Sequence, residues 1–162
     1  YLTATAQDSQ HAPFVAALTE ATRDYPEVDV FLLAHGNAYF RWVEELPPAS
    51  RRKVRLVYDT GGGSASHGPR WLALGVQAFV GHPGGNIAPL FFVKFLPRWL
   101  AGEKLEPAVA AANAETHQAM VSLPGRAVAT VTGWVTGSPV DTSRLWDGTE
   151  AQLFTAPAVA PP

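Results

Sequence analysis

The sequence contains three short runs of apolar residues, and each run ends at glycine or polar residues. They span residues 28–34, 54–58 and 76–80. Runs this short and apolar are typical of strands buried on both faces of a sheet. Segments of helical length separate the runs and follow the last of them, at residues 12–23, 39–46, 67–74, 87–101 and 106–121. The alternation predicts an α/β fold with three layers, in which helices flank a mostly parallel sheet.

Two further segments favour strands, and the C-terminal end favours a tail. Residues 2–6 and the β-branched stretch 127–136 would bring the sheet to five strands. Residues 155–162 are small, Pro-rich and uncharged, which is typical of a linker or a frayed terminus. We therefore expect a single domain over residues 1–154.

Within its central strands, aspartate in place of Leu33 or Val57 should bury an unpaired charge and abolish folding.

One of the expected helices is rich in aromatic residues. Four aromatic residues and Leu100 recur at helical spacing, so they predict a helix face buried in the core. They are Phe91, Phe92, Phe95, Trp99 and Leu100.

Charge, hydropathy and the cysteine count exclude several classes. The 12 basic and 14 acidic residues give a net charge of −2, too little positive field to hold a phosphate backbone, so we expect no nucleic-acid partner. Residues 87–100 are interrupted by prolines and by Lys94 and Arg98, so we expect a soluble chain without a membrane span. The sequence begins at Tyr1 rather than Met, which leaves a removed N-terminal region and the localisation open. Without cysteine, a disulfide framework, a thiolate zinc site and a cysteine nucleophile are all excluded.

Polar residues gather where the three predicted strands end. Parallel sheets bind ligands outside the carboxyl ends of their strands, where loops and helix N-termini converge. We expect a functional site at this edge. The strands bring His35, Asp59 and His82 there, and a nearby loop adds Ser64, Ser66 and His67.

Two of these strand ends carry motifs that resemble a known family. The first strand ends in Ala-His-Gly (34–36) and the second in Asp-Thr-Gly-Gly-Gly-Ser (59–64). This pattern resembles the core of the caspase-like cysteine peptidases, which include caspases, metacaspases, legumains and gingipains, and the resemblance covers residues 28–121. It implies that His35 is the general base and Gly36 an oxyanion-hole N–H. It also implies that Asp59 is the acidic residue before the nucleophile.

The sequence departs from this family at the nucleophile. The position of the catalytic cysteine falls on Gly61, which has no side chain to attack a carbonyl, and no other cysteine replaces it. The resemblance therefore implies a degenerate domain without cysteine peptidase activity or cofactor, acting as a binding or regulatory scaffold for a protein or peptide. The family fold also has a strand and a helix before the segment that residues 2–23 resemble. We expect a preceding region of the polypeptide, or a second chain, to supply that inner strand.

A serine hydrolase is the main alternative. Ser64 or Ser66 would be the nucleophile and His35 the base. The surrounding Gly-Gly-Gly-Ser-Ala-Ser sequence is not the Gly-x-Ser-x-Gly nucleophile elbow, and Ser66 is placed to cap the helix expected at 67–74.

Three other interpretations rest on fewer residues. A metal-dependent site would use His35, His67, His82 and Asp59, although no His-x-x-x-His spacing supports it. The glycine run would suit a phosphate, but it lacks the Gly-Lys-Ser/Thr ending of a P-loop. The sequence Asp-Thr-Gly also marks aspartic peptidases, which are all-β proteins, whereas helical segments follow Asp59 here.

Overall fold

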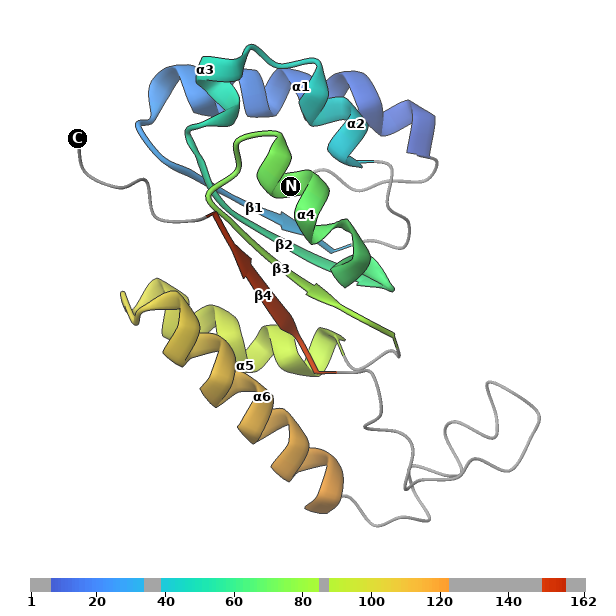
Figure 1. Ribbon diagram of the computed structural model, residues 1–162, viewed down its shortest axis with the longest axis vertical. Coiled ribbons are helices and arrows are strands. Elements are labelled where there is room, and N and C mark those ends of the chain that lie inside the picture. Colours follow the sequence, from blue (N-terminus) through green and yellow to red (C-terminus); the bar gives the residue numbers. More distant parts are fainter. Residues whose placement is uncertain (1–6, 34–38, 85–87, 123–149, 157–162) are drawn as a thin grey trace.

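The chain forms an α/β domain built on one four-stranded sheet (Figure 1). The computed structural model describes residues 7–33, 39–84, 88–122 and 150–156. The strands are β1 (Val28–Leu32), β2 (Val54–Gly62), β3 (Ala78–His82) and β4 (Gln152–Thr155). The helices are α1 (Gln7–Asp24), α2 (Tyr39–Glu44), α3 (Pro48–Arg51), the 3₁₀ turn η1 (Ser64–His67), α4 (Gly68–Ala73), α5 (Ala88–Leu100) and α6 (Leu105–Ser122).

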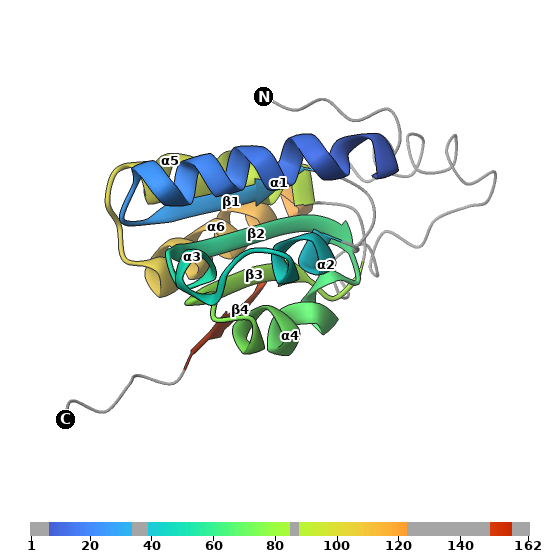
Figure 2. The same ribbon diagram turned by 90° about the horizontal axis from the view of Figure 1, so that it is seen from above.

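The sheet has the order β1-β2-β3-β4 and is mostly parallel. Strands β1, β2 and β3 run parallel, and β4 pairs antiparallel with β3. Helices α1 to α4 lie on one face and α5 and α6 on the other (Figure 1). Seen from above, α1 lies at the β1 side of the sheet and α4 at the β4 side (Figure 2). The predicted α/β class and mostly parallel sheet are confirmed.

The alternation of side chains along β2 divides the core into two clusters. Val57 packs with the cluster under α1, α2 and α4, whereas Leu56 and Tyr58 pack with the cluster under α5 and α6. Phe91 and Phe95 are fully buried in the second cluster. Because both faces of β2 and β3 are covered, their central residues are mostly apolar, which is why the apolar runs located them.

Two predictions about buried side chains are wrong. Strand β1 ends at Leu32, and Leu33 is 53% exposed, so an aspartate there would remain in contact with water. Leu100 is 74% exposed at the end of α5, although the other four residues of its predicted face are buried or partly buried. Both leucines lie where an element ends and the neighbouring layer no longer covers the chain.

The fourth strand differs from the prediction for the C-terminal end. Thr155 was expected to begin a tail, but it pairs with Ala78 as the last residue of β4, and Ala156 N–H donates to Gln77 O at 2.9 Å. The strands expected at residues 2–6 and 127–136 lie outside the described residues. Within the part of the chain that the structure describes, no helix is both long and apolar enough to cross a membrane.

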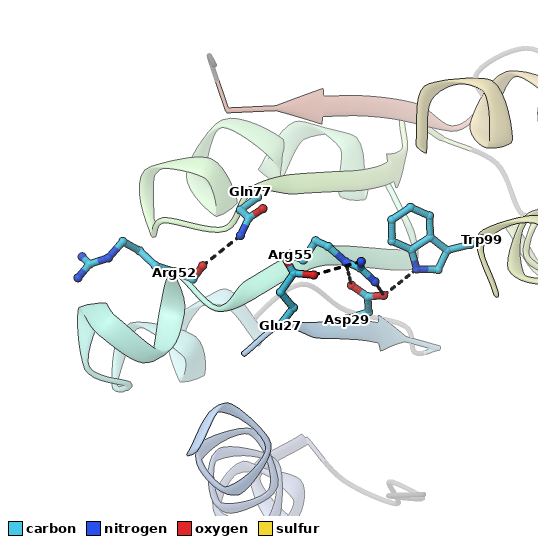
Figure 3. A network of polar contacts seen from close by, with 6 residues as sticks. All are labelled: Glu27, Asp29, Arg52, Arg55, Gln77 and Trp99. Carbon is cyan, nitrogen blue, oxygen red and sulfur yellow. Dashed lines mark hydrogen bonds and ion pairs between the residues drawn. The ribbon is translucent and has the colours of Figure 1, made fainter. Parts of the chain in front are cut away.

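A polar clamp joins β1, β2 and α5 on the second face (Figure 3). Arg55 of β2 donates two hydrogen bonds to Asp29 of β1, Nε to Oδ1 at 3.0 Å and Nη2 to Oδ2 at 2.7 Å. Trp99 Nε1 donates to the same Oδ2 at 2.7 Å, and the guanidinium lies 4.6 Å from the centre of the Trp99 ring. Glu27 accepts a further bond from Arg55 at 3.3 Å. The carboxylate of Asp29 is therefore fully paired.

Candidate functional site

Strand β2 continues beyond its predicted end and bulges at the carboxyl edge of the sheet. Asp59 pairs with Gly81, but the next pairing joins Gly62 to His82, so Thr60 and Gly61 are extra residues on β2. Gly61 N–H donates to Asp59 Oδ1 at 2.8 Å, which folds the carboxylate back over the bulge. Bulges of this kind are frequent beside functional sites, because they redirect side chains at the end of a strand.

Asp59 is buried, and no described residue supplies a counter-charge to its carboxylate. It is only 2% exposed, and none of the ion pairs in the described part of the chain involves it. Burial raises the pKa of its carboxyl to about 6, and the hydrogen bond from Gly61 opposes that rise only in part. Burial, and then the nearby Asp59 carboxylate, also raises the pKa of Tyr39 on α2. Strong pKa shifts from burial are most common in functional sites.

Ser64 links the two strands across the bulge. Its hydroxyl donates to Asp59 O at 3.0 Å and accepts from His82 N–H at 2.9 Å, and the residue is completely buried. The left-handed conformation of Gly63, with φ of 78°, turns the chain so that Ser64 reaches back to β2. The hydroxyl thus takes the place of the ladder hydrogen bonds that the bulge interrupts.

His82 and Asp59 lie on opposite faces of the sheet. His82 is 1% exposed, its Nε2 is 3.1 Å from Tyr58 Oη, and its ring lies nearly perpendicular to the Phe91 ring of α5, with 5.3 Å between the ring centres. Tyr58 and Asp59 are consecutive in β2, so their side chains point to opposite faces. The edge therefore holds two separate polar groups rather than one joint cluster of Asp59 and His82.

Ser66 and His67 differ in part from their predicted roles. Ser66 is exposed, and its hydroxyl donates to Gly63 O at 2.7 Å inside η1. The N-cap of α4 is His67, and no side chain caps that helix, so the predicted Ser66 cap is wrong. The His67 ring packs against Phe40 at 5.5 Å, and its buried Nδ1 has no hydrogen-bond partner among the residues that the structure describes.

Several predicted site residues are not brought together by the described structure. His35 and Gly36 lie outside the described residues. Among the residues that the structure does describe, no three His, Asp or Glu side chains lie close enough together to hold a metal ion. Gly61, at the expected nucleophile position, is buried within β2.

Tyr58 and Tyr39 belong to the surroundings of the site, and the sequence analysis missed both. Tyr58 stands inside the apolar run that predicted β2, directly before Asp59. Successive side chains of a strand point to opposite faces of the sheet, and this alternation could have predicted that Tyr58 and Asp59 lie on different faces. Tyr39 begins α2, and no motif marks it.

A comparison of the chain with protein-family models, with curated proteins and with solved structures found no match.

Proposed function

We propose that this chain is a caspase-like binding domain without peptidase activity, and that its strand-end site receives a cationic group of a protein or peptide partner. The observation that carries the proposal is Asp59, a buried carboxylate that has one N–H donor and no ion pair among the described residues. The motifs at residues 34–36 and 59–64, with Gly61 in place of the cysteine, supply the family resemblance.

The energetics of Asp59 support a binding role. Its pKa of about 6, against an ordinary value of 3.8, means that ionisation at neutral pH costs the fold about 3 kcal/mol. A fold keeps such a residue when function compensates for lost stability. An ammonium or guanidinium group placed against the carboxylate would remove most of this penalty, because an opposite charge favours the ionised form.

Hydrolysis has less support from the described residues. Gly61 offers no nucleophile, and the Ser64 hydroxyl is buried with its proton given to Asp59 O and a lone pair given to His82 N–H. Using Ser64 as a nucleophile would break the link between β2 and β3. Ser66 has an exposed position, so a hydrolase with Ser66 and His35 is the alternative that the experiment must separate.

The first experiment is a titration with N-acetyl-arginine methylamide and with its neutral isostere, N-acetyl-citrulline methylamide, followed by NMR chemical shifts at pH 7.5. The arginine compound should bind and the citrulline compound should not. Asp59→Asn should remove the binding, whereas Asp24→Asn at the exposed end of α1 should not change it. Affinity should fall as pH drops through about 6, because protonation removes the charge of Asp59.

Two outcomes would contradict the proposal. Equal binding of the two compounds would show that the site does not select a cation. Stoichiometric labelling of Ser64 or Ser66 by a fluorophosphonate, lost in a His35→Ala variant, would instead establish the hydrolase.

A further inference from the structure

Strand β4 forms an edge of the sheet and is fixed firmly in place. The Asn113 side chain on α6 donates to Ala151 O at 2.9 Å and accepts from Ala151 N–H at 3.0 Å, which holds the beginning of β4. Near its other end, a Cβ on Gly68 would lie 2.5 Å from the Phe154 ring, so only glycine allows this close packing of α4 on β4. Among the described strands, β4 pairs with β3 alone, and its outer backbone groups face away from the sheet.

A groove flanks β4 on each face of the sheet. Towards α6, the groove is lined by Leu153 and Thr155 of β4 and by Val109 and Asn113 of the helix, and it measures about 460 Å³. Towards α4, the groove is lined by Gln152 and Phe154 together with Ala65, Ser66, Pro69 and Pro83, and it measures about 360 Å³. Both volumes fall within the roughly 300–1,000 Å³ of small-ligand pockets, so each groove has room for side chains. Alternate residues of β4 thus line opposite grooves, Leu153 and Thr155 one and Gln152 and Phe154 the other.

The two grooves differ in charge. Glu106 and Glu150 line the groove towards α6, and no basic residue lines it. The groove towards α4 has no charged lining residue, and Phe154 and the two prolines make it apolar. The first groove therefore favours a basic side chain, and the second favours an aliphatic one.

We propose that the outer edge of β4 binds an extended peptide segment whose side chains alternate between basic and apolar. An added strand would pair its backbone with the outward-facing groups of β4, which no other described strand contacts, and would send successive side chains to opposite faces, one set to each groove. Strand β4 has four residues, about 13 Å of edge, so the bound segment is about four to six residues long. This site is separate from Asp59 and does not depend on the proposed function.

The test measures fluorescence anisotropy with a labelled peptide, acetyl-Lys-Val-Lys-Val-Lys-Val-amide. The alternating peptide should bind at least ten times more tightly than acetyl-Lys-Lys-Lys-Val-Val-Val-amide, which has the same composition. Two further peptides carry N-methyl groups on the backbone, one on the three valine nitrogens and the other on the three lysine backbone nitrogens. Only one of these two sets of N–H groups can face β4, so methylation should abolish binding in at least one of the two peptides.

Matched variants locate the binding site. Gln152→Trp fills the apolar groove and should weaken binding at least ten-fold, whereas Gln118→Trp on the exposed surface of α6 should leave it unchanged. Glu106→Gln should weaken binding about three-fold, as expected for an exposed ion pair, and Glu20→Gln on α1 should not. Asp59→Asn should have no effect, so failure here and failure of the arginine test are distinguishable.

Several results would overturn the proposal. The proposal is wrong if the alternating peptide and the block peptide bind with equal affinity. It is also wrong if the Gln152→Trp variant binds the alternating peptide with unchanged affinity. A dimer in light scattering that Gln152→Trp dissociates would assign the edge to a second copy of the chain. Hydrogen exchange of the monomer without peptide gives a further outcome. If the amides of residues 152–155 that face away from β3 resist exchange, the edge of β4 is occupied by another segment of the same chain.

Discussion

Asp29 on β1 and Asp59 on β2 are carboxylates on two neighbouring parallel strands of one sheet, and their surroundings are opposite. Asp29 has a side chain that is 17% exposed and receives three hydrogen bonds, two from Arg55 and one from Trp99. Asp59 is more deeply buried and, within the described part of the chain, its carboxylate receives one, from the N–H of Gly61. The Asp29 carboxylate joins three elements of the fold, whereas the ionised Asp59 carboxylate lowers the stability of the fold. The difference indicates that partners, rather than burial alone, decide whether a carboxylate stabilises a sheet.

An aspartate with no partner at all should have the largest effect. Val57→Asp places the carboxylate on β2 in the cluster under α1 and α2, where Val57 is 1% exposed. The described side chains of this cluster are hydrophobic and carry no charge to meet the carboxylate, so we expect destabilisation by at least about 5 kcal/mol and loss of the folded state. Far-UV circular dichroism and the yield of soluble protein measure this, and a folded variant with normal stability would show that the β2 core tolerates charge.

Removing the charge of Asp59 should stabilise the protein. Asp59→Asn keeps an oxygen for the Gly61 N–H, and we expect a gain of about 3 kcal/mol at pH 7. The folded pKa of about 6 lies above 3.8, so the folded state binds the proton more tightly, and the Asp59 contribution to stability falls as pH rises from about 4 to about 6. Urea unfolding of both proteins at pH 4, 5, 6 and 7 measures the difference, which should be near zero at pH 4. A difference that does not grow with pH would contradict the unpaired state of Asp59.

Breaking the clamp should be destabilising by a smaller amount. Asp29→Ala leaves the Trp99 N–H without its acceptor and leaves Arg55 with Glu27 alone, and both side chains are partly exposed, so we expect a loss of about 2 kcal/mol. A double-mutant cycle with Arg55→Ala, followed by urea unfolding, should give a coupling of about 1 kcal/mol. Full additivity of the two substitutions would mean that the clamp contributes nothing beyond packing.

The smallest effect is expected one residue beyond the end of β1. Leu33→Asp places a carboxylate in water, since Leu33 is 53% exposed, and the unfolding free energy should change by no more than about 0.5 kcal/mol. Thermal unfolding beside the Val57→Asp sample checks it. A loss as large as that of Val57→Asp would place Leu33 in the core after all.

The sequence predicted the strands that are covered on both faces of the sheet. Its predictions were wrong at the exposed edge of the sheet and at the end of a strand. The runs at residues 54–58 and 76–80 correspond to strands because helices cover both faces of β2 and β3. Strand β4 was missed because its four residues are half-buried or exposed and carry no apolar run. Leu33 was misplaced because the composition of the run does not change where the sheet stops.

At the site, the sequence located residues but not their partners. It placed Asp59 and His82 at one edge, and the structure has both there. It treated the glycine run as a loop, because nothing in Gly-Gly-Gly reveals that Gly61 N–H returns to Asp59 and keeps the chain in β2. The internal role of Ser64 depends on the bulge, which no local pattern encodes.

The bulge also bears on how freely the chain can change over evolutionary time. The hydrogen bonds that shape it come from the side chains of Asp59 and Ser64 and from backbone groups, and none uses a side chain at position 61. Gly61 is not among the described glycines with positive φ, so its backbone does not demand glycine. Under the proposed family resemblance, a side chain at position 61 would have to fit a buried position, but its gain or loss would remove none of these hydrogen bonds. The residue at position 61 would then record selection on chemistry, whereas Asp59 and Ser64 would record selection on the shape of the bulge.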